Sequence, residues 1–166
     1  MAALKLLIAE DDLALAALLE EYLVEYGYEV DVHHRGDTAL EALKTRHYDL
    51  ILTDVVMPGA DGLTLLARAG GDPEKTLVIL MTGYSGIDDA IHAVDQGAYD
   101  FVSKPFQLPE IKVRLDNAAR YQTLLRRWNE VADEQSMHSG AEDAYRSQEM
   151  ITLPENAAVK AYVSGK

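Results

Sequence analysis

Short apolar runs and amphipathic segments alternate along the first two thirds of the chain. The apolar runs are three to six residues long and rich in Leu, Ile and Val, which is typical of strands. The strands expected from them are Leu4–Ala9, Glu29–His33, Leu50–Thr53, Leu77–Met81 and Phe101–Ser103. Strands that alternate with helical segments are typical of repeated βα units, so the pattern predicts a parallel sheet.

The segments between these runs repeat their apolar positions every three to four residues, as helices do. The expected helices are about Leu13–Tyr26, Thr38–Arg46, Leu63–Ala69, Ile87–Gln96 and one that starts near Leu108-Pro109. The first carries apolar side chains at Leu15, Leu18, Leu19, Tyr22, Leu23 and Tyr26. Asp37 is the expected cap of the second helix, and Gly27 and Gly97 are expected stops of the first and fourth.

The third and fourth strands are almost continuously apolar, which predicts central strands covered by helices on both faces. The second strand alternates apolar and polar residues and is therefore expected at an edge. With right-handed crossovers, these positions predict an α/β fold with a doubly wound five-stranded parallel sheet in the order 2-1-3-4-5.

Apolar residues continue at helical spacing beyond the last expected βα unit. They are Tyr121, Leu124, Leu125, Trp128, Val131 and Ala132. An extended C-terminal helix is therefore expected, whose apolar stripe either folds back over its own domain, forms a dimer contact or docks a partner. Residues 136–166 lack such a period and are expected to form a flexible tail, with one short ordered piece at Met150–Leu153.

Composition narrows the class of protein. The chain has 166 residues, a formal net charge of −13 and no cysteine. The acidity argues against a basic nucleic-acid-binding face, and the missing cysteines exclude disulfides and thiolate metal sites. Because no apolar run is long enough to span a bilayer, we expect a soluble cytoplasmic protein with no membrane contact.

Charged residues follow three of the apolar strands. The cluster Glu10-Asp11-Asp12 follows the first strand, Asp54 ends the third, and Lys104-Pro105 follows the fifth. The carboxyl ends of parallel strands share one edge, where open α/β sheets place their chemistry. An acidic cluster alone is more often a helix cap, but together with Asp54 and Lys104 it predicts one site for a divalent cation and a phosphoryl group.

Four motifs in this order resemble the receiver domain of bacterial two-component response regulators. They are Leu7-Ile8-Ala9-Glu10-Asp11-Asp12, Asp54-Val55-Val56-Met57-Pro58-Gly59-Ala60-Asp61-Gly62, Met81-Thr82-Gly83 and Phe101-Val102-Ser103-Lys104-Pro105-Phe106. The resemblance covers about residues 3–121 and implies a flavodoxin-like receiver domain at 1–121. Residues 122–166 would then be a helical extension and tail without a recognisable output domain.

The resemblance also implies roles for single residues. Asp54 would accept the phosphoryl group, and Mg²⁺ would be held by Asp11, Asp54, the Val56 carbonyl and, through water, Glu10. Lys104, preceding a cis proline bond, would supply a mobile cation, while Thr82 and Phe101 would act as the switch pair. The role of Asp12, as a helix cap or a second layer of the site, stays open.

Partners follow from the same resemblance. The phosphoryl donor would be a sensor histidine kinase or a histidine phosphotransfer protein, in signal transduction or a phosphorelay. The surface of the fourth helix, fifth strand and fifth helix would bind a downstream protein target. A homodimer through that face or through the C-terminal helix is left open, and no nucleic-acid binding by this chain is expected.

Val56 and Tyr84 lie two residues beyond the expected acceptor and switch threonine, beside the path of an attacking water. Both would shield the acyl phosphate more than small polar residues, so a persistent phosphoryl group is predicted. None of the five histidines has ligand spacing, and none is interpreted as catalytic or metal-binding.

Three function classes remain on sequence alone. The first is a stand-alone receiver, favoured because no effector domain is recognisable, which would be an autocatalytic phosphoacceptor and no turnover enzyme. The second is a receiver cut from a larger transcriptional regulator, with a linker helix from Tyr121. The third is a phosphatase of the haloacid-dehalogenase type, which expects a second acid where this chain has Val56.

Overall fold

The computed structural model describes residues 2–83 and 87–139. Its strands are β1 (Lys5–Ala9), β2 (Glu29–His33), β3 (Leu50–Asp54), β4 (Leu77–Thr82) and β5 (Asp100–Ser103). Its helices are α1 (Leu13–Glu25), α2 (Gly36–Thr45), α3 (Gly62–Ala69), α4 (Ile87–Asp95) and α5 (Leu108–Ser139). Every strand and helix predicted from the apolar pattern of residues 4–139 is present, with bounds shifted by no more than two residues where both ends were predicted.

The five strands form one parallel sheet in the order β2-β1-β3-β4-β5, which confirms the predicted topology. Ala9 lies opposite Thr53, and Asp54 lies opposite Met81. This register brings the carboxyl ends of β1, β3 and β4 to the same edge of the sheet. The residues that follow these strands therefore meet there.

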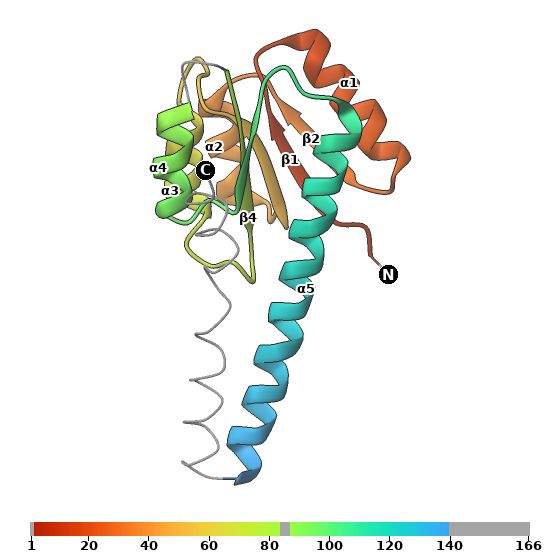
Figure 1. Ribbon diagram of the computed structural model, residues 1–166, viewed down its shortest axis with the longest axis vertical. Coiled ribbons are helices and arrows are strands. Elements are labelled where there is room, and N and C mark those ends of the chain that lie inside the picture. The colour runs from red at the N-terminus through yellow and green to blue at the C-terminus, as the bar shows by residue number, and fades with distance from the viewer. Residues whose placement is uncertain (1, 84–86, 140–166) are drawn as a thin grey trace. The chain divides into compact units, whose positions relative to one another are not determined.

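Helices cover both faces of the sheet (Figure 1): α1 and the first turns of α5 lie on one side, and α2, α3 and α4 on the other. β3 and β4 are buried at every position, as their continuous apolar character predicted. In β2 the alternating residues are half-buried or exposed, which fits its place at the sheet edge. The core therefore lies on both faces of the three central strands.

The buried face of α1 is narrower than its apolar sequence indicated. Ala16, Leu19 and Leu23 are buried, whereas Leu18 and Tyr26 are both 53% exposed. Positions three and four residues apart suffice to cover the sheet, so apolar side chains beside that stripe remain outside the core. Tyr26 instead lies under the Lys112 ammonium of α5, whose nitrogen is 4.8 Å from the ring centre.

The predicted cap of α2 is wrong. The helix begins at Gly36, its cap position is Arg35, and no side chain caps it. Asp37 lies inside the first turn, where it pairs with the Arg35 guanidinium at 3.0 Å. Within that turn its Oδ1 also accepts a hydrogen bond from the Thr38 amide at 2.9 Å, and the carboxylate complements the helix dipole from this position.

The chain divides into two compact units, Met1–Arg120 and Tyr121–Lys166. The first holds the sheet, and α5 continues into the second. In the described part of the second unit, Leu124, Trp128 and Val131 are 64%, 40% and 50% exposed. The predicted start of the tail at residue 136 is wrong, because α5 continues to Ser139. Tyr84 and the piece predicted at Met150–Leu153 lie outside the described residues.

Candidate functional site

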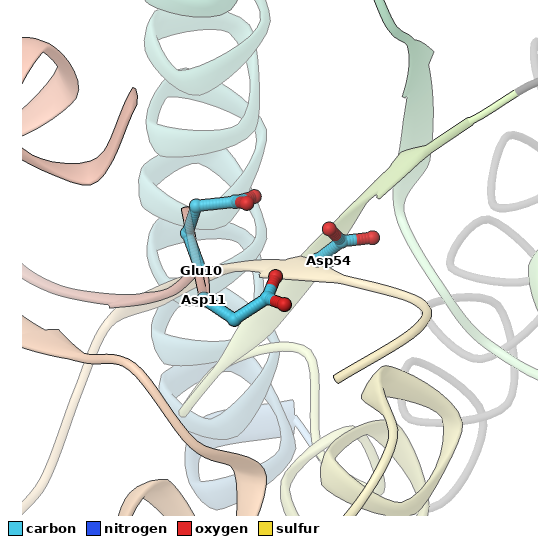
Figure 2. Close-up of side chains that lie close together, drawn as sticks. All are labelled: Glu10, Asp11 and Asp54. Carbon is cyan, nitrogen blue, oxygen red and sulfur yellow. The ribbon is translucent and has the colours of Figure 1, made fainter. Parts of the chain in front are cut away.

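Three carboxylates converge at the carboxyl edge of the sheet. Glu10 and Asp11 follow β1, and Asp54 is the last residue of β3. Figure 2 shows the three side chains close together, with Glu10 and Asp11 pointing to the side on which Asp54 lies. One oxygen from each lies within 4.8 Å of the others, close enough to surround a single small cation. The predicted convergence of these residues is thus present in the structure.

Asp54 is held from two directions. The residue is only 8% exposed, and its side chain 11%. The amide of Val56 donates to Oδ1 at 3.3 Å, and the Lys104 ammonium donates to Oδ2 at 2.7 Å. These contacts orient the carboxylate at the end of a rigid central strand. The Val56 side chain itself is 71% exposed beside it.

Lys104 connects two of the carboxylates. Its Nζ donates to Glu10 Oε2 at 2.8 Å and to Asp54 Oδ2 at 2.7 Å. The residue is placed by its backbone amide, which donates to the Thr82 carbonyl at 2.7 Å, and the Lys104–Pro105 bond is cis as the resemblance implied. Burial acts to lower the pKa of Lys104, but hydrogen bonds to Asp54 and Glu10 outweigh it, so the pKa is raised and the cation is retained.

Glu10 is the most deeply buried member, at 1% exposure. Burial raises its pKa, opposed by the hydrogen bond from Lys104 and reinforced by the nearby charge of Asp54. The Glu10 backbone is held by the last residue of β2 and the residue after it. Its amide donates to His33 O at 3.0 Å, and the His34 ring contacts its carbonyl through Nδ1 at 3.1 Å. His34 thus helps to position the Glu10 backbone, a role that the spacing of histidines in the sequence did not indicate.

Asp11 and Asp12 have different tasks although they are adjacent. Asp12 is the cap of α1, and its Oδ1 accepts from the amides of Ala14 and Leu15 at 3.0 and 3.1 Å. Its own amide donates to Glu10 Oε1 at 3.2 Å. Asp11 is exposed and belongs to the carboxylate cluster. The side chain of Asp12 is therefore the helix cap, while its backbone amide supports Glu10.

The predicted switch residues lie at the ends of β4 and β5. Thr82 is fully buried, one residue beyond the strand partner of Asp54, and its hydroxyl donates to the Gly83 carbonyl at 2.8 Å. Phe101 is 9% exposed in β5. The switch roles that the resemblance implied stay predictions, because these contacts do not join either residue to the carboxylate cluster.

The turn after Asp54 depends on Gly62. Its amide donates to the Val55 carbonyl at 2.9 Å, which closes the turn against β3. A Cβ at this position would lie 2.4 Å from the Asp54 carbonyl oxygen. Only glycine permits this approach, so Gly62 helps to set the backbone of the acceptor strand.

The donor set fits a hard divalent cation. Mg²⁺ binds oxygen ligands, commonly one or two carboxylates with water completing the shell. Three carboxylates beside one ammonium leave a surplus of negative charge, and the open side at Asp11 would admit a hydrated ion. Glu10, Asp11 and Asp54 are the residues that would hold it.

The model of the response regulator receiver domain matches residues 6–116. The chain is 34% identical over 123 residues to the transcriptional regulatory protein DltR of Streptococcus agalactiae, covering 74% of this chain and 55% of that protein. It is 38% identical over 115 residues to the uncharacterized transcriptional regulatory protein YkoG of Bacillus subtilis, covering 69% of this chain and 50% of the relative. The chain thus spans about half the length of these relatives.

A solved structure shares the fold. The response regulator receiver domain protein of Clostridium thermocellum superposes with a TM-score of 0.68 at 26% identity. The match covers 74% of this chain and 98% of that one.

Among the residues that the structure describes, none of the helices combines the length and apolarity that crossing a bilayer requires.

Proposed function

Because the chain belongs to the response regulator receiver domain family of two-component systems, we propose that Asp54 is its phosphoryl acceptor and that Glu10, Asp11 and Lys104 serve the transfer. One oxygen of Asp54 attacks the phosphorus of a phosphohistidine on a sensor kinase or phosphotransfer protein. A P–O bond forms as the P–N bond breaks, and the imidazole leaves with the bonding pair and takes up a proton. The observation that carries this proposal is the Lys104 ammonium bridging Asp54 and Glu10 at 2.7 and 2.8 Å.

Charge is the main obstacle to this reaction, since an anionic carboxylate must approach an anionic phosphoryl group. Bound Mg²⁺ would neutralise phosphoryl charge and fix the geometry of transfer. The chain's own contribution is to hold Asp54 by the Val56 amide and Lys104, and to supply the Glu10 and Asp11 oxygens, with the Val56 carbonyl as the proposed backbone ligand.

Lys104 has a second task after transfer. Phosphorylation adds negative charge at Asp54, and a compact ammonium on a flexible stem can follow that charge without the fixed geometry of a guanidinium. The Lys104 contact to Asp54 Oδ2 is then exchanged for one to a phosphoryl oxygen. Glu10 keeps its own contact at 2.8 Å and anchors the lysine during the exchange.

The signal leaves the site through Thr82 and Phe101. The Thr82 hydroxyl donates to Gly83 O at 2.8 Å in this state. In the phosphorylated state it donates to the phosphoryl group instead, the Gly83 bond is lost, and Phe101 repacks. This population shift changes the surface of α4, β5 and α5, which binds the downstream protein target.

The whole protein is proposed to be a regulator of signal transduction. The relatives DltR and YkoG are named transcriptional regulatory proteins, and this chain matches about half of each. Their names support an output in gene regulation, and the part of α5 after residue 121 extends the helix to Ser139, beyond the receiver domain.

Incubation with acetyl phosphate, with and without Mg²⁺, tests the proposal. Intact mass should show one phosphoryl group per chain with Mg²⁺ and almost none after chelation, while a generic phosphate ester should not be turned over. The control is Asp88→Asn, which removes an exposed carboxylate of α4. Continuous ester hydrolysis would indicate a phosphatase instead, and labelling that ignores Mg²⁺ would contradict the role of the carboxylate cluster.

A further inference from the structure

The described end of α5 carries an exposed apolar stripe that the receiver chemistry does not use. Leu124, Trp128 and Val131 are 64%, 40% and 50% exposed. They are separated by four and three residues, the spacing that keeps side chains on one seam of a helix. Contiguous exposed apolar surface of this kind commonly marks an interaction site.

Charge along the same stretch is segregated. Before Trp128 the helix carries Arg126 and Arg127, and after it Glu130, Asp133 and Glu134. Two such helices running parallel would place acidic half beside acidic half. In an antiparallel pair, the basic half of each helix lies against the acidic half of the other. Electrostatic attraction therefore favours the antiparallel arrangement.

We propose that Leu124, Trp128 and Val131 pack against the same residues of a second copy of this chain in an antiparallel helix pair. With Trp128 of each helix opposite Val131 of the other, Arg127 of one copy lies beside Glu134 of the other. The two residues are seven apart, about 10.5 Å along one helix, so they do not pair within a chain. Arg127 and Glu134 can therefore form an ion pair with each other only between two copies of the chain.

Because only three apolar residues of each helix form the contact, the dimer should be weak, and the dimeric fraction should rise with protein concentration. Trp128 is the only tryptophan of the chain and reports directly on the contact. Its emission should shift to shorter wavelength as the concentration rises, because pairing buries the indole. If residues 140–166 of the same chain occupied the stripe instead, the emission would not depend on concentration.

Charge reversal on the full chain, measured by sedimentation velocity, tests the pairing. Arg127→Glu and Glu134→Arg should each raise the dimer dissociation constant about tenfold, since two pairs are lost and two repulsions gained, each contributing a few-fold. An equimolar mixture of the two variants should regain wild-type association as a heterodimer. The matched control is Glu20→Arg, which makes the same charge change as Glu134→Arg at an exposed position of α1, outside the helix pair.

Three results would overturn the proposal. A chain that stays monomeric at every concentration would assign the stripe to its own tail or to another partner. A dimer that neither charge reversal weakens would place the contact elsewhere. Variants that weaken association but fail to rescue each other would exclude the antiparallel register.

Discussion

Single residues at the sheet edge divide the work of the site. Asp54 and Lys104 make the shortest contact of the cluster, at 2.7 Å. Glu10, which also binds Lys104, is only 1% exposed to solvent. Their convergence was predictable because the carboxyl ends of parallel strands share an edge. The contact of His34 with the Glu10 carbonyl was not, because it depends on the path of the segment after β2 rather than on spacing.

Replacing Lys104 by methionine leaves Glu10 and Asp54 buried without their cation. The free energy of unfolding should fall by about 2–4 kcal/mol, somewhat less than the ~3–5 kcal/mol for breaking a fully buried pair, because the Lys104 side chain is 24% exposed. Millimolar Mg²⁺ should recover part of this loss, because it binds only the folded cluster and replaces the missing charge.

Urea unfolding with and without Mg²⁺ measures both effects. The matched control is Lys112→Met, which removes a lysine paired with Asp116 away from the site and should cost much less. A Lys104→Met protein as stable as the wild type would show that the contacts at 2.7 and 2.8 Å contribute little.

Val56 is expected to prolong the phosphorylated state. Its side chain is 71% exposed beside Asp54, where it hinders an approaching water. Val56→Asn should shorten the lifetime of the acyl phosphate several-fold, since a polar side chain admits and orients water. Decay of the phosphorylated protein after removal of the donor measures this, with Val113→Asn as the exposed-valine control. An unchanged lifetime would remove the shielding role.

Elements were predicted well where one physical signal dominated. The buried strands β3 and β4 are apolar throughout, so their place at the centre of the sheet followed from composition alone. The start of α2 could not be predicted in this way. Arg35, at the cap position, is not a residue type that usually caps helices, whereas Asp37 is such a type but lies inside the first turn. The narrow buried face of α1 likewise depends on packing that the sequence does not encode position by position.

Asp11 and Asp12 separate helix capping from metal binding. Asp12→Ala should lower the free energy of unfolding by about 1 kcal/mol, because the cap of α1 is lost, and leave Mg²⁺ affinity nearly unchanged. Asp11→Ala should do the reverse. Denaturant unfolding and Mg²⁺ titration of each variant measure the two effects. Equal loss of Mg²⁺ affinity in both variants would show that Asp12 also serves the site.

The edge strand β2 carries a pH-dependent contribution to stability. Burial acts to raise the pKa of Asp31, but contacts from Tyr48, His33 and Arg46 outweigh it, so the pKa is lowered from 3.8. The stabilisation is therefore present above pH 3.8 and is lost as the pH falls through the lowered value. The wild type should be more stable than Asp31→Asn at neutral pH, with the difference vanishing in acid.

Chemical unfolding of both proteins from pH 7 to pH 2 tests this. The exposed Asp88→Asn variant is the control and should follow the wild type. A difference between wild type and Asp31→Asn that stayed constant with pH would show that the contacts do not depend on the ionised carboxylate.

At the scale of the whole molecule, we propose different roles for the receiver unit and the C-terminal extension. The receiver unit, Met1–Arg120, contains every residue assigned to phosphoryl transfer. The extension contains the stripe assigned to self-association. Sequence periodicity predicted the extended helix, but exposure of Leu124, Trp128 and Val131 became visible only in the structure, because a period does not reveal which face is covered.

The most direct measurement identifies the residue that carries the phosphoryl group. The protein is treated with acetyl phosphate and Mg²⁺, the acyl phosphate is reduced with borohydride, and peptides are sequenced by mass spectrometry. The account predicts homoserine at position 54 in the wild type and no modified residue in Asp54→Ala. Reduction at another carboxylate, or undiminished labelling of Asp54→Ala, would contradict it.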